Sequence, residues 1–243
     1  MRKIKFEVGR IYHVYNRGVN KCLIFNDESD MWRFVQALYL FNDVNSSFNT
    51  LYQIERENKG KMNFNLLKDF IEKNKENRKP LVRIMVDCLM PNHFHLILEE
   101  IEEDGISRFM HKLAIGYTGY FNKKYNRVGG LFQGPFKAVE IKDDLQLQYV
   151  LAYINIINPG QLINPNLKEE GIKDLEELEK ILNFAEKYSF STNPDYLELR
   201  DSIIIDKGIY KDFFPTGEKY KEFIKDILLS KKYNLVDNLI LEK

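Results

Sequence analysis

Two histidines separated by a single residue, His93 and His95, carry the strongest chemical signal in this chain of 243 residues. They lie in the segment Met-Pro-Asn-His-Phe-His-Leu-Ile, which becomes apolar beyond the histidines. If this segment is a β-strand, both rings project from the same face of the sheet, with their β-carbons roughly 7 Å apart. Two neutral imidazoles at that separation can bind one metal ion. The alternative interpretation is a half-buried polar pair that binds nothing.

The pattern of polar and apolar residues predicts the elements that position this pair. Strands are expected at residues 10–17, 81–89, 93–99 and 136–141, and the second and third form a hairpin. Helices are expected at residues 31–40, 66–74, 105–125 and 145–158, and a polar loop at 42–62. This order predicts an α+β fold, a ferredoxin-like (RRM-like) antiparallel sheet with helices packed on one face.

The remainder of the chain is expected to be mainly helical. Candidate helices lie at residues 175–188 and 217–232, and no internal repeat is present. We therefore divide the chain into a domain at residues 1–160, with a variable insertion at 42–80, and a helical C-terminal extension at 161–243.

The composition is that of a globular protein, with 44% hydrophobic and 30% charged residues. No apolar run approaches the roughly 20 residues that span a bilayer, and the first residues lack the apolar core of a signal peptide. These features predict a cytoplasmic protein with no membrane partner. The two cysteines, Cys22 and Cys88, are interpreted as reduced structural residues.

Basic residues are unevenly distributed, although the formal net charge is zero. Residues 107–139 contain six Lys or Arg and no Asp or Glu. Such a run is often only a solvated helix surface, but it also predicts a positive face that contacts nucleic-acid phosphates. The candidate DNA-binding residues are Arg17, Arg108, Lys112, Lys123, Lys124, Arg127 and Lys137.

Four ordered motifs within residues 8–160 resemble those of a known family. They are Tyr-His-Val-Tyr-Asn-Arg-Gly at 12–18, Met-Pro-Asn-His-Phe-His-Leu at 90–96, Leu-Phe-Gln-Gly at 131–134, and Tyr-Ile followed by Asn-Pro within 153–159. Together they resemble the single-tyrosine HUH transposases of insertion sequences (transposase IS200-like), in particular the REP-associated tyrosine transposases. The resemblance implies a homodimeric, metal-dependent enzyme that cleaves and rejoins single-stranded or hairpin DNA through a 5′-phosphotyrosine.

The same resemblance assigns roles to individual residues. It implies that His93 and His95 bind Mg²⁺ or Mn²⁺ and that Tyr153 is the nucleophile, with Tyr149, one helical turn earlier, as the second choice. A third metal ligand is expected from the tyrosine helix. Asn158 is the first candidate, although it follows Tyr153 by five residues where the family usually has four.

On a regular helix the position one turn beyond Tyr153 is Ile157, which cannot bind a metal. Asn158 reaches the same face only if the helix loosens or contains a one-residue bulge near Pro159. Asn155 is rotated away from Tyr153 on an ideal helix and ranks second.

Two other functions remain open at this point. The first is a non-catalytic nucleic-acid-binding module on an RRM-like sheet, with structural histidines. The second is a metal-dependent phosphodiesterase that uses water as the nucleophile.

Overall fold

A computed structural model describes residues 4–45, 56, 69, 72 and 78–230 of the chain. The insertion at 42–80 falls largely outside this part. So do most of the loop expected at 42–62 and of the helix expected at 66–74.

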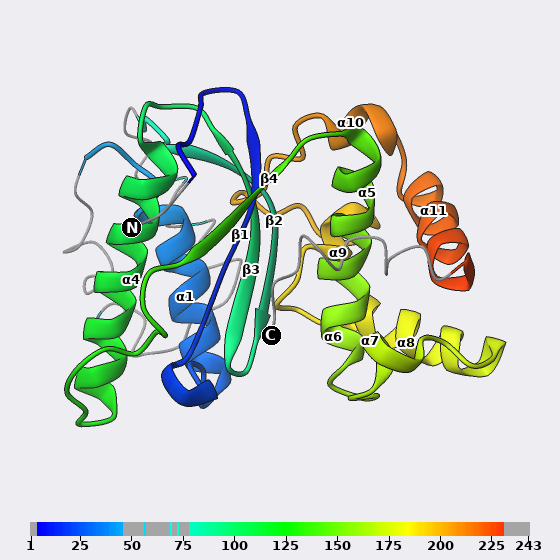
Figure 1. The fold of residues 1–243 in the computed structure, drawn as a ribbon, viewed down its shortest axis with the longest axis horizontal. Helices are drawn as coiled ribbons and strands as arrows, with labels where there is room; N and C mark the ends of the chain where they lie inside the picture. Colours follow the sequence, from blue (N-terminus) through cyan, green and yellow to red (C-terminus); the bar gives the residue numbers. More distant parts are fainter. Residues whose placement is uncertain (1–3, 46–55, 57–68, 70–71, 73–77, 231–243) are drawn as a thin grey trace.

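Four antiparallel strands form the central sheet (Figure 1). They are β1 (Ile11–Arg17), β2 (Val82–Met90), β3 (His93–Glu100) and β4 (Lys137–Ile141), in the spatial order β2-β3-β1-β4. Helix α1 (Glu28–Leu40) follows β1, α4 (Gly105–Lys124) follows β3, and α5 (Asp144–Ala152) follows β4. This order and pairing confirm the predicted ferredoxin-like α+β fold, and the strand and helix bounds differ from the predictions by only a few residues.

Helices cover both faces of the sheet and not one face as predicted, because side chains of β3 alternate between two cores. Phe94, Leu96 and Leu98 pack in the core that includes α1 and α4, whereas Ile97 packs in the core that includes α5. Figure 1 shows α1 and α4 on one side of the sheet and α5 with the later helices on the other. The two histidines share the face of Ile97 and therefore point toward α5.

The following elements make up the rest of the secondary structure in the described residues. They are the 3₁₀ turn η1 (Val19–Lys21), the π-helical segment η2 (Tyr153–Ile157), α6 (Asn158–Gly160), α7 (Leu167–Glu170), α8 (Leu175–Lys187), α9 (Asn193–Tyr196), α10 (Tyr210–Phe213) and α11 (Gly217–Ser230). The predicted helical character of the C-terminal extension is thereby confirmed for its described residues.

The C-terminal extension is hydrogen-bonded to the edge strand β2. The Leu89 amide donates to the Phe190 carbonyl at 2.8 Å, and the Thr192 amide donates to the Asp87 carbonyl at 3.0 Å. These bonds satisfy backbone groups that an edge strand would otherwise expose to solvent. The extension is thus built onto the sheet that carries the histidines.

Candidate active site

The two histidines of β3 lie on one face of the sheet, as predicted from their spacing. Their ring centroids are 5.1 Å apart and the ring planes are nearly perpendicular, at 88°. His95 is fully buried, whereas His93 is half-buried at the strand end. Of the two side chains, His93 is therefore the one that solvent reaches.

Hydrogen bonds at the Nδ1 atoms orient both rings. Nδ1 of His93 lies 2.7 Å from Oδ1 of Asn92, and an amide oxygen only accepts, so this contact is a hydrogen bond in the tautomer that has its proton on Nδ1. Nδ1 of His95 lies 2.8 Å from Nε2 of the buried His13, which β1 places beside it. When His95 donates in this pair, the Nε2 atoms of both His93 and His95 carry lone pairs. Metal-binding histidines commonly have such a partner at the other ring nitrogen.

Tyr153 lies against this histidine pair. Asp143 caps the N-terminus of helix α5, because its carboxylate accepts the Gln146 amide at 2.8 Å, and the helix leads directly into Tyr153. The Tyr153 side chain is 1% exposed, and its ring meets His95 edge to face with the centroids 6.0 Å apart. The second candidate, Tyr149, is also buried and lies one turn earlier. The fold thus brings together a strand and a helix that are about 60 residues apart in the sequence.

The helix changes its hydrogen-bond pattern at Tyr153. Residues Tyr153–Ile157 form one π-helical turn, in which the Asn158 amide donates to the Tyr153 carbonyl. A π turn bonds residues five apart, so Asn158 follows Tyr153 by one turn along the helix. The bulge that the five-residue spacing requires is therefore present.

The two candidate asparagines have different surroundings. The Asn155 amide donates to the Tyr220 hydroxyl at 3.1 Å and accepts from the Thr192 hydroxyl at 2.8 Å, so it is engaged with the C-terminal extension. Asn158 is fully buried, and its Oδ1 accepts only a long bond of 3.4 Å from Gln161. Among the described residues no acceptor lies within hydrogen-bond distance of its Nδ2. A buried amide that is half-satisfied is uncommon and is consistent with a partner outside the chain.

A cavity of about 300 Å³ lies beside His93. Its basic lining residues are Arg17, Lys21 and Lys137, and the Arg17 Nε donates to Oε1 of Gln133 at 2.5 Å. Two of the predicted DNA-binding residues are therefore next to the histidine pair. Lys21 was missed by the sequence analysis, although it follows the motif at 12–18 by only three residues.

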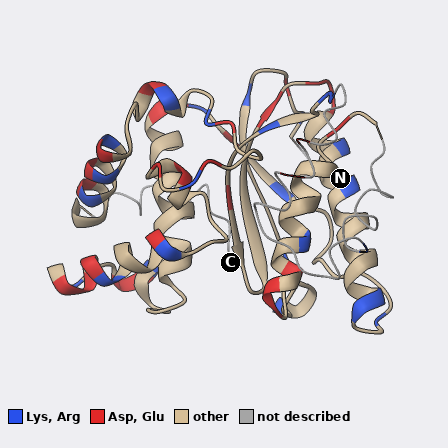
Figure 2. Cartoon of the chain, turned by 180° about the vertical axis from the view of Figure 1, so that it is seen from behind, with Lys and Arg blue, Asp and Glu red and all other residues tan. Residues whose placement is uncertain are grey.

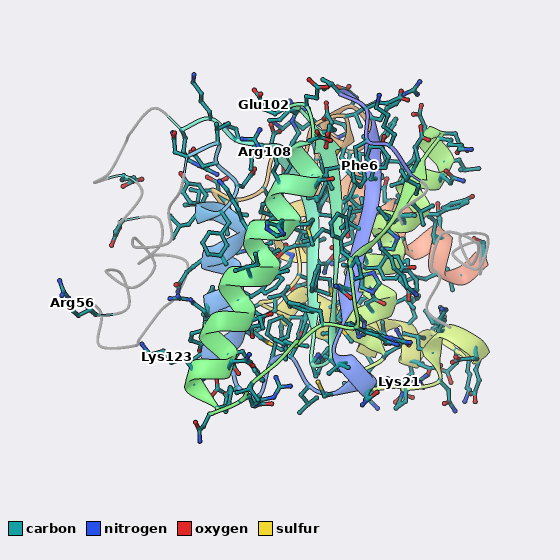
Figure 3. All side chains as sticks on the ribbon, turned by 60° about the vertical axis from the view of Figure 1, so that its left-hand side comes forward. Phe6, Lys21, Arg56, Glu102, Arg108 and Lys123 are labelled. Atoms are coloured by element: carbon teal, nitrogen blue, oxygen red, sulfur yellow. The ribbon has the colours of Figure 1, made fainter. Side chains whose placement is uncertain are left out.

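The other predicted cations belong to α4 and the turn after it, on the opposite side of the sheet. Figure 2 shows Lys and Arg but no Asp or Glu along α4, and Figure 3 shows Arg108 and Lys123 toward its two ends. Both of these residues are exposed. The DNA-binding role of this helix stays a prediction.

Three of these cations are engaged with other parts of the protein. The Lys112 amine donates to the Asp43 and Asn45 carbonyls, and Lys124 pairs with Asp27 and with the buried Asp30. The Arg127 guanidinium donates to Oδ1 of Asn122 at 3.4 Å. Lys112 and Lys124 therefore join α4 to α1 and the residues that follow it.

The donor set limits how a metal could bind. The described residues contain no group of three or more His, Cys, Asp or Glu side chains arranged for a metal ion. The candidate metal ligands are therefore two imidazoles and one amide oxygen. Such a set leaves several coordination positions for substrate oxygens and water.

The fold and the site define a ferredoxin-like α+β protein in which a strand histidine pair faces a buried helix tyrosine. Residues 55–156 match the family model described as "Transposase IS200 like". This segment includes the histidine strand and Tyr153, and it is similar to the family that the sequence motifs resemble.

Comparison with solved structures and curated proteins gives two further findings, and the chain's own helices give a third. The structure of a REP-associated tyrosine transposase bound to a REP hairpin matches with a TM-score of 0.45 and 14% sequence identity, covering 85% of this chain and 93% of that chain. No curated protein matches the sequence. Within the described residues, no helix combines the length and apolar character that a membrane span requires.

Proposed function

We propose that this protein is a metal-dependent transposase that cleaves and rejoins single-stranded or hairpin DNA with Tyr153 as its nucleophile. The observation that carries the proposal is the contact between the Tyr153 ring and His95, which puts a phenol at a histidine pair suited to bind a metal. The match of residues 55–156 to the transposase family supports the same function.

The proposed reaction exchanges one phosphodiester bond for another. The Tyr153 phenolic oxygen loses its proton and attacks a backbone phosphorus, forming a new P–O bond. The bond from that phosphorus to the 3′ oxygen breaks, and this oxygen takes a proton. The product is a 5′-phosphotyrosine with a free 3′-hydroxyl, and attack by a 3′-hydroxyl reverses the step at a new junction.

Residues of this chain fit a divalent cation. The Nε2 atoms of His93 and His95 would hold it, and Asn158 would supply an amide oxygen if its amide is turned to place Oδ1 where Nδ2 now lies. Bound Mg²⁺ or Mn²⁺ would polarise the phosphoryl oxygens and offset their negative charge. His13 and Asn92 contribute by fixing the orientation of the two rings.

The cavity beside His93 is the proposed path of the DNA backbone. Arg17, Lys21 and Lys137 surround it, and each can neutralise a phosphate. The exposed cations Arg108 and Lys123 of α4 lie on the other face of the sheet. DNA that contacts both these cations and the His93 cavity would have to pass around the edge of the sheet. We also propose that the protein acts as a homodimer, which sedimentation velocity measures directly.

The test is incubation of the protein and Mn²⁺ with end-labelled single-stranded DNA that contains a hairpin. We expect a denaturant-resistant protein–DNA adduct, and mass spectrometry of its peptides should locate the DNA on Tyr153. Cleavage to free ends without an adduct would indicate a phosphodiesterase. Binding without cleavage would favour the non-catalytic module.

A further inference from the structure

A lysine of the C-terminal extension reaches the proposed nucleophile. Lys168 belongs to α7, and its Nζ lies 5.6 Å from the centroid of the Tyr153 ring. This separation is within the range in which an ammonium is attracted to the face of an aromatic ring. Lys168 lies outside residues 55–156, the segment that matches the transposase family.

The backbone that carries Lys168 is fixed by packing. Its neighbour Leu167 is fully buried, in the core that contains α5 and α8. A β-carbon at Gly160 would lie only 2.5 Å from Cδ2 of Leu167 and 3.2 Å from Cγ2 of Ile181, so glycine permits this close approach. Figure 1 shows α6, α7 and α8 together at the end of the tyrosine helix. The position of Lys168 is thus part of the fold.

Glu170, an acidic residue of the same helix, has partners other than Lys168. The Glu170 carboxylate pairs with Lys173 at 2.7 Å and accepts from Asn166 at 2.9 Å. Lys168 is half-buried, and its ammonium lies over the Tyr153 ring.

We infer that Lys168 is a positioning residue for Tyr153, supplied by the C-terminal extension. Its ammonium holds the phenol ring against the His pair and puts a positive charge beside the atom that attacks an anionic phosphodiester. The inference rests on the proposed function, because it gives Lys168 a role only through Tyr153. Lys168 is half-buried, and a cation–π contact that stabilises the transition state at such a position raises the rate about three- to thirtyfold.

The experiment compares Lys168→Met, Lys168→Arg and a control, Lys180→Met, which removes an exposed lysine of α8. For each, the single-turnover rate of adduct formation at saturating hairpin DNA and the Kd for that DNA are measured separately. We expect Lys168→Met to lower the rate about three- to thirtyfold with the Kd within twofold of wild type. Lys168→Arg should recover most of the rate, and Lys180→Met should match wild type in both quantities.

Three outcomes would overturn the inference. They are an unchanged rate in Lys168→Met, a loss that appears only in the Kd, and a failure of arginine to restore the rate in a variant that melts at the wild-type temperature. Each of these leaves the wild-type adduct intact and so leaves the proposed function standing. Absence of an adduct in the wild type would instead contradict the proposed function itself.

Discussion

Lys124 is expected to stabilise the fold, although the sequence places it in a basic run that suggests DNA binding. Its amine lies 2.8 Å from Oδ1 of Asp30, a carboxylate with no solvent exposure, and it also pairs with Asp27. Burial opposes the charged amine, but the hydrogen bonds that it donates to Asp30 and Asp27 raise the pKa of Lys124 above its usual range. Replacing Lys124 with Met removes a cation that is paired with this buried carboxylate.

The magnitude follows from what remains around that carboxylate. Breaking a buried ion pair costs about 3–5 kcal/mol, whereas an exposed pair contributes about 0–1 kcal/mol. Asp30 keeps hydrogen bonds from the Asn26 amide and from the Tyr120 and Tyr125 hydroxyls, and the Lys124 side chain is 28% exposed. We therefore expect Lys124→Met to lower the free energy of unfolding by about 2 kcal/mol.

Urea unfolding measures this change, and the fluorescence of Trp32 on α1 reports on the same region. Lys123→Met is the matched control, because Lys123 is exposed on the same helix, and it should stay within about 0.5 kcal/mol of wild type. A Lys124→Met variant as stable as the control would refute the reasoning and return Lys124 to the group of cations available for DNA.

Three further predictions concern the DNA path, the metal and the extension. Lys21→Ala with Lys137→Ala should reduce the slope of log affinity for single-stranded DNA against log salt by about 1.4, and an unchanged slope would move the DNA away from the His93 cavity. Calorimetric titration with Mn²⁺ should show weaker binding for Asn158→Ala than for Asn155→Ala; equal binding by wild type and the Asn158 variant would remove this ligand. Burial raises the pKa of Asp87 to about 7 from an unfolded value of 3.8, with Arg200 opposing and Asp195 adding to the shift. The free energy of unfolding should therefore fall as pH rises between about 4 and 7, because Asp87 ionises first in the unfolded chain. Urea unfolding of Asp87→Asn should show a smaller fall over this range. At pH 8 the variant's free energy of unfolding should exceed that of wild type by at most about 4 kcal/mol. Parallel pH profiles would contradict a buried neutral Asp87.

The elements that hold the site were predictable because their signals are local. Alternation of polar and apolar residues identifies β3 and puts both histidines on one face. The bulge after Tyr153 also had a local signal, since the five-residue spacing to Asn158 and the following proline require an irregular turn.

The partners of these residues were not predictable, because they depend on tertiary packing. The pairing of His13 with His95 needs the register between β1 and β3, which are joined by a long stretch of chain. The role of Lys112 depended on which carbonyls α1 would bring near its amine. Amphipathic helices in the extension indicated burial, but not that they would cover the second face of the sheet and bring Lys168 close to the Tyr153 ring.

The central claim is that the Tyr153 hydroxyl performs the chemistry. Its most direct test is adduct formation on labelled single-stranded hairpin DNA by Tyr153→Phe, with Tyr149→Phe as the matched control on the same helix. The account predicts no adduct from the Tyr153 variant, with DNA binding and melting temperature close to wild type, and an adduct from the Tyr149 variant. An adduct from Tyr153→Phe together with none from Tyr149→Phe would contradict it.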